Sequence, residues 1–483
     1  MTINRLPDEV LLDIFDWYRQ EFVGSYLRKG WREGYTWLDL AHVCRKWRAV
    51  MSGSACRLDL GIFVGPKKPD HIETLGPWPI FIDYESTSSN ITGSGHWRML
   101  DILRHHDRVR EIAFAGWFDD LDKFITMANC PFPMLEGLHF YFMTGGEFKL
   151  PDTFIRGPDL SIQHLRRLTL VDVTLASISR FLSSATALTK LELVLHIDSG
   201  FGPSQEMTLL TCLRGMPSLH RLDLSIIFKF SISPNLMRSI TPQPSPRKEI
   251  GLLSKLNRFH YVGPCVLLDA LLAGLSAPSL RDFDINLIHE IPAIVHLPRF
   301  INEIEEHYSA AQVALGERQS RLLLLTHVEY ASRGRPDFSF TRRSLPNESP
   351  EPIESIMRMS EVLFTRLVTV EELRVSLIAV WVDNIPWRRF LQRFTNLKVL
   401  RIGGAKHNCI AAIARSLLQD YEGPDDYLAF LPSLEVIEIE KSSIFEARRG
   451  PELAAFEPFL SARQKAGCPV SILWPIVGSV VGE

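Results

Sequence analysis

Residues 165–193 read LRRLTLVDVTLASISRFLSSATALTKLEL, and this stretch decides the fold. It begins and ends with one pattern, in which an apolar residue is followed by two polar residues, an apolar, a polar and an apolar residue. The alternating end of the pattern is typical of a short strand that buries every second side chain. Between the two copies, apolar residues recur at intervals of three and four, which indicates a helix. The stretch therefore predicts strand, loop, helix and strand.

The same pattern recurs along most of the chain. Its copies are VREIAF at 109, LEGLHF at 135, LRRLTL at 165, LTKLEL at 188, LHRLDL at 219, LNRFHY at 256, LRDFDI at 280, VEELRV at 370, LKVLRI at 397 and LEVIEI at 434. A repeat of this kind buries its leucines only against neighbouring units, so several units are needed for a stable core. The alternative is a chance recurrence of leucines in a large α/β fold.

Composition indicates a folded chain without strong bulk charge. The 483 residues are 46% hydrophobic and 23% charged, and the formal net charge is −3. This balance argues against a nucleic-acid or membrane-surface binder driven by bulk charge. We expect no secretory signal and no membrane span, because no window is apolar over roughly eighteen residues. The seven scattered cysteines indicate reduced thiols of the cytoplasm or nucleus.

Two short amphipathic helices are predicted within residues 4–22 and 37–51. Pro7 suits the first position of a helix, and Asp8 and Glu9 follow where the helix dipole favours acids. The apolar stripes are Val10, Leu11, Ile14, Phe15 and Tyr18 in the first helix and Leu40, Val43, Cys44 and Trp47 in the second. A unit of about fifty residues is marginal alone. Another surface should therefore cover part of these stripes.

LPDEVLLDIF at residues 6–15, followed by LAHVCRKWR at 40–48, resembles the F-box, with a longer spacer (19–36) that is similar to large fungal families. F-box modules dock on the Skp-type adaptor of a cullin-RING ubiquitin ligase. The resemblance implies an adaptor-binding set of Leu6, Pro7, Leu11, Ile14, Phe15, Leu40, Val43, Cys44 and Trp47. The alternative is an ordinary helical hairpin that caps the domain behind it.

The repeats resemble the degenerate leucine-rich repeats that follow the F-box in many substrate receptors. The expected fold class is α/β: a helical F-box (1–55), a linker with the first solenoid units (56–108), an irregular leucine-rich-repeat solenoid (109–445) and a C-terminal cap (446–483). Parallel strands are expected on the concave face, with helices outside. SRLLLLTHV (320–328) is expected to be a strand. Residues 231–249 and 332–355 are expected to be exposed loops, either tolerated surface loops or target-contacting insertions.

A protein target would contact the open face of the strands. The polar residues of successive repeats form a largely basic column beside a mixed column, and the candidate target-binding residues are Arg167, Lys190, Glu192, Arg221, Asp223, Arg258 and His260. Such columns could bind a target of complementary charge, or a phosphorylated segment. The alternative is a solvated face whose opposite charges pair across neighbouring strands.

The sequence contains no motif for catalysis, for a metal or for a cofactor that its context supports. His105-His106 lacks a third metal ligand at useful spacing, and Gly145-Gly146 and Gly403-Gly404 open no phosphate-binding loop. The resemblance therefore implies a non-enzymatic substrate receptor of a Skp-cullin-F-box ligase, in cytoplasm or nucleus. The competing hypotheses are a repeat scaffold that acts outside ubiquitination, and a hydrolase or transferase on an α/β domain.

Overall fold

The computed structural model describes the chain in eighteen segments. They are residues 6–17, 43–54, 62–64, 78–85, 102–116, 132–142, 164–197, 203–228, 250–288, 295–304, 310–315, 319–325, 338–343, 352–377, 387–403, 407–417, 430–439 and 449–473. The chain divides into two compact units. Met1–Asp198 with Thr211–Leu219 form unit 1, and Ser199–Leu210 with His220–Glu483 form unit 2.

Unit 1 combines helices near the N-terminus with a parallel sheet. Its described elements are a helix over residues 8–17, α3 (Arg45–Gly53), β1 (Ile62–Val64), β2 (Ile80–Glu85), the 3-10 helix η4 (His106–Arg108), β3 (Val109–Gly116), β4 (Gly137–Phe142), β5 (Arg167–Val173), α7 (Leu175–Ser184) and β6 (Lys190–Ile197). Helix α8 (Pro203–Arg214) has residues in both units. Strands β1 to β6 pair in chain order, and each pair is parallel.

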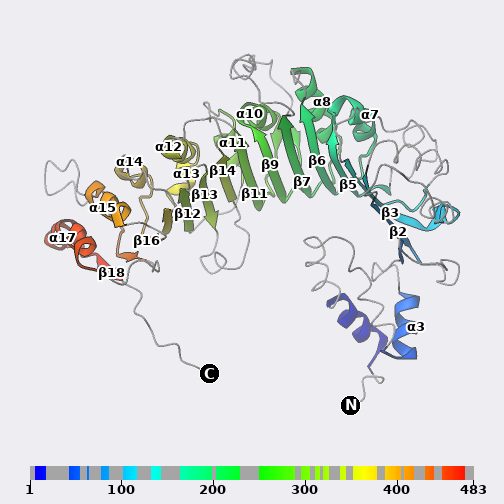
Figure 1. The fold of residues 1–483 in the computed structure, drawn as a ribbon, viewed down its shortest axis with the longest axis horizontal. Helices are drawn as coiled ribbons and strands as arrows, with labels where there is room; N and C mark the ends of the chain where they lie inside the picture. The colour runs from blue at the N-terminus through cyan, green and yellow to red at the C-terminus, as the bar shows by residue number, and fades with distance from the viewer. Residues whose placement is uncertain are drawn as a thin grey trace. The chain divides into compact units, whose positions relative to one another are not determined.

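The alternation of leucines explains why these segments form strands. In β5 and β6 the side chains of Leu168, Leu170, Leu191 and Leu193 are fully buried. Each buried leucine contributes about 1.5 to 3 kcal/mol relative to an exposed one. Helix α7 lies along one side of the sheet (Figure 1) and buries its own apolar stripe, including Phe181. The side chains that alternate with these leucines point to the opposite face of the sheet.

Unit 2 continues the alternation of strands and helices. Its elements are β7 (Arg221–Phe228), β8 (Gly251–Leu252), β9 (Arg258–Pro264), α10 (Cys265–Ala273), β10 (Leu275–Ser276), β11 (Asp282–Ile288), α11 (Leu297–Asn302), β12 (Ala310–Leu315), β13 (Gln319–Leu325), β14 (Phe338–Arg343), α12 (Pro352–Val362), α13 (Phe364–Leu367), β15 (Glu372–Leu377), α14 (Trp387–Leu391), β16 (Val399–Gly403), α15 (His407–Ser416), β17 (Val436–Ile439), α17 (Arg449–Lys465) and β18 (Ser471–Leu473). The main sheet has the order β7-β9-β11-β14-β13-β12-β15-β16-β17-β18, and β8 pairs with β10 in a separate small sheet.

All ten copies of the sequence pattern contain a strand that pairs in parallel with a neighbour. The remaining strands of unit 2 depart from this arrangement, because β13 pairs antiparallel with both β12 and β14. Only three residues separate β12 from β13, and so short a connection permits an antiparallel hairpin but not a parallel crossover. The strand predicted within 320–328 is confirmed as part of β13, although its antiparallel pairing was not expected.

The prediction of one continuous exposed loop over 332–355 is wrong in part. Strand β14 lies within it and pairs in parallel with β11, with Phe338 opposite Phe283 and Phe340 opposite Ile285. The alternating FSF of β14 is a strand pattern whose signal was obscured by the flanking proline, serine and arginine residues. The loop predicted over 231–249 lies outside the described residues.

The described C-terminal elements are one helix and one strand. Helix α17 ends at Lys465, and Gly467 then has a φ of 80°, a left-handed conformation that glycine adopts without steric cost. Strand β18 pairs in parallel with β17. No helix among the described residues is long and apolar enough to cross a membrane.

Candidate protein-docking site

The first candidate site is the helical module formed by residues 6–17 and 43–54. Helix 8–17 begins after Pro7, whose carbonyl oxygen accepts a hydrogen bond from the amide of Leu11 at 3.1 Å. Helix α3 begins after Cys44, and the Sγ atom of Cys44 accepts a hydrogen bond from the amide of Trp47 at 3.4 Å. Cys44 therefore caps the second helix, in place of the serine or aspartate that is usual at this position.

The two helices share a small apolar core. Its buried members are Leu11, Leu12, Phe15, Trp47, Val50 and Met51. The rings of Phe15 and Trp47 meet edge to face, with their centroids 5.0 Å apart. Leu6 and Cys44 pack against this cluster and are partly buried. Five predicted adaptor-binding residues thus belong to the core or its margin, where their first role is to hold the module together.

A second set of apolar side chains points outward. Val10, Ile14 and Trp17 have 41%, 37% and 64% of their surface exposed, and Val43 has 52%. The spacing of four and three places the first three on one side of the helix. We call Val10, Ile14, Trp17 and Val43 the outer set. Val10 and Trp17 were not among the predicted site residues, although their spacing from Ile14 already indicated that all three lie on one side of the helix.

Polar contacts fix the beginning of the first helix. Lys46 Nζ donates a hydrogen bond of 2.6 Å to the carbonyl oxygen of Leu6 and lies 3.3 Å from Asp8 Oδ1. The Asp8 side chain is largely exposed, so this ion pair contributes at most about 1 kcal/mol. Pro7 is exposed beside these contacts. Leu40, the ninth predicted adaptor-binding residue, lies outside the described residues.

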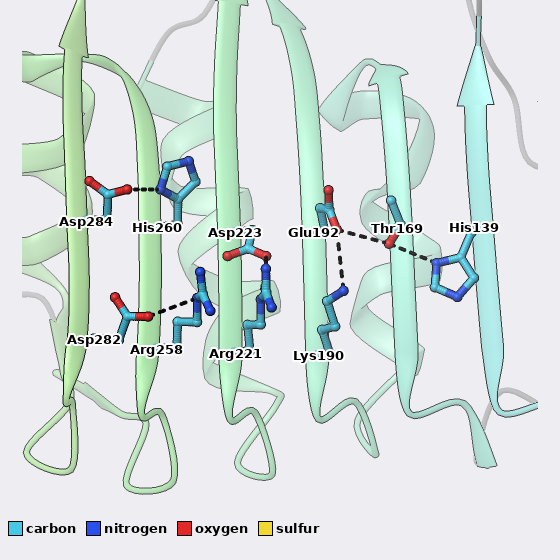
Figure 2. Close-up of polar contacts among 10 residues, drawn as sticks. All are labelled: His139, Thr169, Lys190, Glu192, Arg221, Asp223, Arg258, His260, Asp282 and Asp284. Carbon is cyan, nitrogen blue, oxygen red and sulfur yellow. Dashed lines mark hydrogen bonds and ion pairs between the residues drawn. The ribbon is translucent and has the colours of Figure 1, made fainter. Parts of the chain in front are cut away.

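The second candidate site is the open face of the sheet. Figure 2 shows the polar side chains that stand on the strands of this face. In unit 1, Lys190 Nζ lies 3.6 Å from Glu192 Oε2 on the same strand. Arg167 Nη2 lies 2.8 Å from Glu111 Oε2, two strands away. Arg167 and Lys190, the two predicted target-binding bases of unit 1, are therefore already paired within the protein.

Unit 2 repeats this arrangement. Arg221 Nη2 lies 2.6 Å from Asp223 Oδ2 on the same strand. On the neighbouring strands β9 and β11, Arg258 Nε lies 3.3 Å from Asp282 Oδ2, and His260 Nδ1 lies 3.0 Å from Asp284 Oδ2 (Figure 2). Opposite charges therefore pair on this face, within one strand for Arg221 and across neighbouring strands for Arg258 and His260. The role of these residues in target binding stays a prediction.

On this face of unit 2, the surroundings shift the pKa values of His260 and Asp282. The hydrogen bond to Asp284 raises the pKa of His260, because it favours the charged imidazolium. Burial raises the pKa of Asp282, and the nearby carboxylates of Asp284 and Asp223 add to this effect against the opposing charges of Arg258 and Arg221. Carboxylates therefore crowd this part of the face.

A buried polar network in unit 1 was not predicted from the sequence. Glu111, which is 2% exposed, contacts His139 Nε2 at 2.8 Å through Oε1 as well as Arg167 through Oε2. His139 Nδ1 lies 2.9 Å from Thr169 Oγ1, which donates a weaker hydrogen bond of 3.4 Å to Glu192 Oε2. Burial acts to raise the pKa of Glu111, but the contact with His139 and the charges of Arg167 and Lys190 outweigh it and lower that pKa.

Gly137 makes room for the Glu111 side chain. It lies between Glu111 and Arg167 in the register of β3, β4 and β5. A Cβ atom on Gly137 would lie 2.8 Å from Glu111 Cγ and 2.9 Å from Glu111 Cδ, closer than carbon atoms approach in proteins. The sequence contained an indication of this contact. Glu111, Gly137 and Arg167 each occupy the third position of the repeat pattern in three successive copies, and equivalent positions lie side by side in paired strands.

The described residues contain no group of three or more histidine, cysteine, aspartate or glutamate side chains placed to bind a metal ion. Glu111, His139 and Thr169 form a chain of acid, imidazole and hydroxyl, an order that also occurs in nucleophilic enzymes. Thr169, however, is 1% exposed, so its hydroxyl cannot meet a substrate in this conformation. The network stabilises the sheet face as it stands.

Comparison with known proteins bears on the helical module. Residues 3–55 match the family model described as F-box-like. No curated protein matches the chain significantly. The matched segment contains both described helices of the module together with its core and its outer set. F-box domains in general bind Skp1-type adaptors. The match identifies an F-box-like domain at the N-terminal end of this sequence.

Proposed function

We propose that this chain is the substrate-recognition subunit of a Skp-cullin-F-box ubiquitin ligase. In this proposal residues 1–55 dock on the Skp-type adaptor, and through it on the cullin-RING ligase, while the sheet units hold a protein target for ubiquitin-dependent degradation. The observation that carries the proposal is the outer set, which exposes four large apolar side chains on a module that the F-box-like model matches. Exposed apolar surface of this kind marks a site for another protein.

The proposal divides the adaptor-binding residues by burial. Exposed side chains such as Ile14 and Val43 contact the adaptor, whereas Phe15 and Trp47 act through the core that keeps the two helices together. Loss of a buried aromatic residue should therefore abolish docking by unfolding the module. Loss of an exposed residue should abolish docking while the module stays folded. Burial alone thus predicts two distinct ways to lose the adaptor.

The sheet units act as an irregular leucine-rich-repeat solenoid of the kind found in fungal F-box proteins. Parallel strands that follow one another in the sheet, with buried leucines at every second position, support this proposal. The chain supplies no catalytic group and no cofactor. Its contribution to ubiquitin transfer is proximity and orientation, and the chemistry belongs to other subunits. Its place of action is the cytoplasm, the nucleus or both.

Adaptor binding tests the proposal directly. The full-length chain and its variants are mixed with a purified Skp-type adaptor, and the dissociation constant is measured by calorimetry. Ile14→Asp should weaken binding at least tenfold without changing the helical circular dichroism, because it places a charge in an apolar interface. Glu9→Gln alters an exposed residue of the same helix outside the outer set and should bind like the wild type. Equal affinity of Ile14→Asp and wild type would contradict the proposal.

One observation favours the second candidate, a repeat scaffold capped by the helical hairpin. Trp78, which lies just before β2, packs against the core of the module. If capping is the module's sole function, deletion of residues 1–55 should destabilise the sheet, and no Skp-type adaptor should bind the intact chain. Adaptor binding with micromolar or better affinity would exclude that candidate.

A further inference from the structure

Trp78 connects the helical module to the sheet of unit 1. Its indole is partly buried against the core cluster that contains Phe15 and Trp47. Its carbonyl oxygen accepts two hydrogen bonds from Arg108, one from Nε at 3.0 Å and one from Nη2 at 2.8 Å. One residue therefore contacts the module through its side chain and the sheet through its backbone.

Both sides of this contact are held in place. Trp78 stands two residues before β2, and Arg108 directly precedes β3, where Ile80 pairs with Val109. The amide of Arg108 also donates a hydrogen bond of 2.9 Å to the carbonyl oxygen of His105. The backbone at each end of the contact is thus continuous with a strand of the sheet.

The Arg108 guanidinium is well suited to hold the backbone of Trp78. Two of its guanidinium nitrogens meet a single carbonyl oxygen, a fork that a lysine ammonium cannot reproduce. Burial lowers the pKa of Arg108, against the opposing charge of Asp107, so the guanidinium is partly removed from water. A cation that gives up hydration in this way needs a fixed partner in return.

We propose that Trp78 and Arg108 form a joint that makes the helical module and strands β2 and β3 one cooperative unit. A disturbance of the module core then spreads to these strands through Trp78. A further consequence rests on the proposed function: the joint fixes the orientation of a docked adaptor relative to the sheet of unit 1. Trp78 and Arg108 are positioning residues, because they act through the elements that they connect.

Hydrogen exchange of the full-length chain tests the joint without any partner. Phe15→Ala should accelerate exchange in helix 8–17 by roughly two to three and a half orders of magnitude, because it leaves a cavity in the module core. The joint predicts that the same variant also accelerates exchange in Ile80–Glu85 and Val109–Gly116 by at least tenfold. In the Trp78→Ala background this additional effect of Phe15→Ala on the two strands should disappear. Unchanged strands beside a loosened helix in Phe15→Ala would overturn the proposal.

Milder variants separate coupling from a general loss of stability. Trp78→Phe keeps an aromatic ring and should preserve the response of the strands, whereas Arg108→Lys keeps the charge, loses the fork and should reduce that response. Arg393→Lys is the matched control, because Arg393 donates to Glu361 in unit 2 and contacts neither partner of the joint. If Arg108→Lys and Arg393→Lys leave the response equally intact, Arg108 has no coupling role and the joint is refuted.

Adding the Skp-type adaptor separates this inference from the proposed function. At a free concentration of one hundred times Kd, the adaptor should slow exchange in helix 8–17 by about 100-fold. The joint predicts that β2 and β3 are slowed as well in the wild type, but not in Arg108→Lys. Protection of the helix without the strands in the wild type would refute the joint and keep the docking proposal. No protection of the helix would refute docking, and the Phe15→Ala measurement would still decide the joint.

Discussion

Gly137→Ala is expected to destabilise unit 1, although alanine is normally the better residue in a strand. The new Cβ would lie 2.8 Å from Glu111 Cγ and would push the buried carboxylate away from its partners. Such overpacking costs about 1 to 3 kcal/mol. The gain from replacing a strand glycine by alanine is about 0.5 to 1 kcal/mol. The net loss should therefore be about 1 kcal/mol at the centre of these two ranges and at most about 2.5 kcal/mol.

The sign of this effect should reverse when Glu111 is shortened. In a Glu111→Ala background the Cβ of residue 137 meets no carboxylate, so Gly137→Ala should stabilise by about 0.5 to 1 kcal/mol. The difference between the two backgrounds is the coupling energy of a double-mutant cycle. Urea-dependent amide exchange in β3 and β5 measures it locally and does not require the whole chain to unfold in one step. If Gly137→Ala stabilises these strands equally in both backgrounds, the account of Glu111 is wrong.

Three more predictions concern the docking module, the sheet face and the C-terminal helix. Phe15→Ala should destabilise the module by about 3 to 5 kcal/mol and lose adaptor binding together with helical circular dichroism, whereas Ile14→Asp should lose binding alone. The pKa of His260 is higher in the folded protein than the unfolded value of about 6.5, so its contact with Asp284 stabilises the folded state fully below pH 6.5 and loses this effect as the pH rises through the folded pKa. His260→Gln should therefore remove this pH dependence from the amide exchange of β9. Arg463→Ala should destabilise α17 by about 2 to 4 kcal/mol in thermal unfolding, since a fully buried guanidinium donates to the carbonyl oxygens of Pro432 and Leu434.

The repeating strands could be predicted because their signal is local. In LTKLEL, the alternation of Leu191 and Leu193 with polar residues already determines which face of the strand is buried. The hairpin β12–β13 could not be predicted in the same way, since its strands lack the repeat pattern and its antiparallel pairing follows from a short connection. Strand β14 was missed because its flanking residues are typical of loops.

The Glu111 network could not be predicted because it depends on the register of three strands. Glu111, Gly137 and Arg167 are far apart in sequence, and nothing local places a carboxylate over a glycine. Only an alignment of the repeat copies by their third position brings the three residues together. Sequence reasoning identified Arg167 as a candidate target-binding base without naming a partner for it, whereas the register gives it a buried acidic partner.

The docking module shows the same limit at a smaller scale. The stripe pattern identified both helices, but it did not separate Phe15, which is buried, from Ile14, which is exposed. That division depends on what covers the helices. Trp47 covers one side from the second helix, and Trp78 packs against the core from the segment just before β2, about sixty residues after the end of the first helix.

The paired charges of the open face bear on how a target could bind there. Partly exposed pairs such as Arg258 with Asp282 contribute at most about 1 kcal/mol, so a target that offers its own charges can replace them at little cost. The pair of Arg167 with Glu111 differs, because breaking it would leave one oxygen of a buried carboxylate without its cation and only the contact with His139 in place, which costs more than breaking a partly exposed pair. Exchange of ion pairs with a target would therefore be easier at the partly exposed pairs than at Arg167.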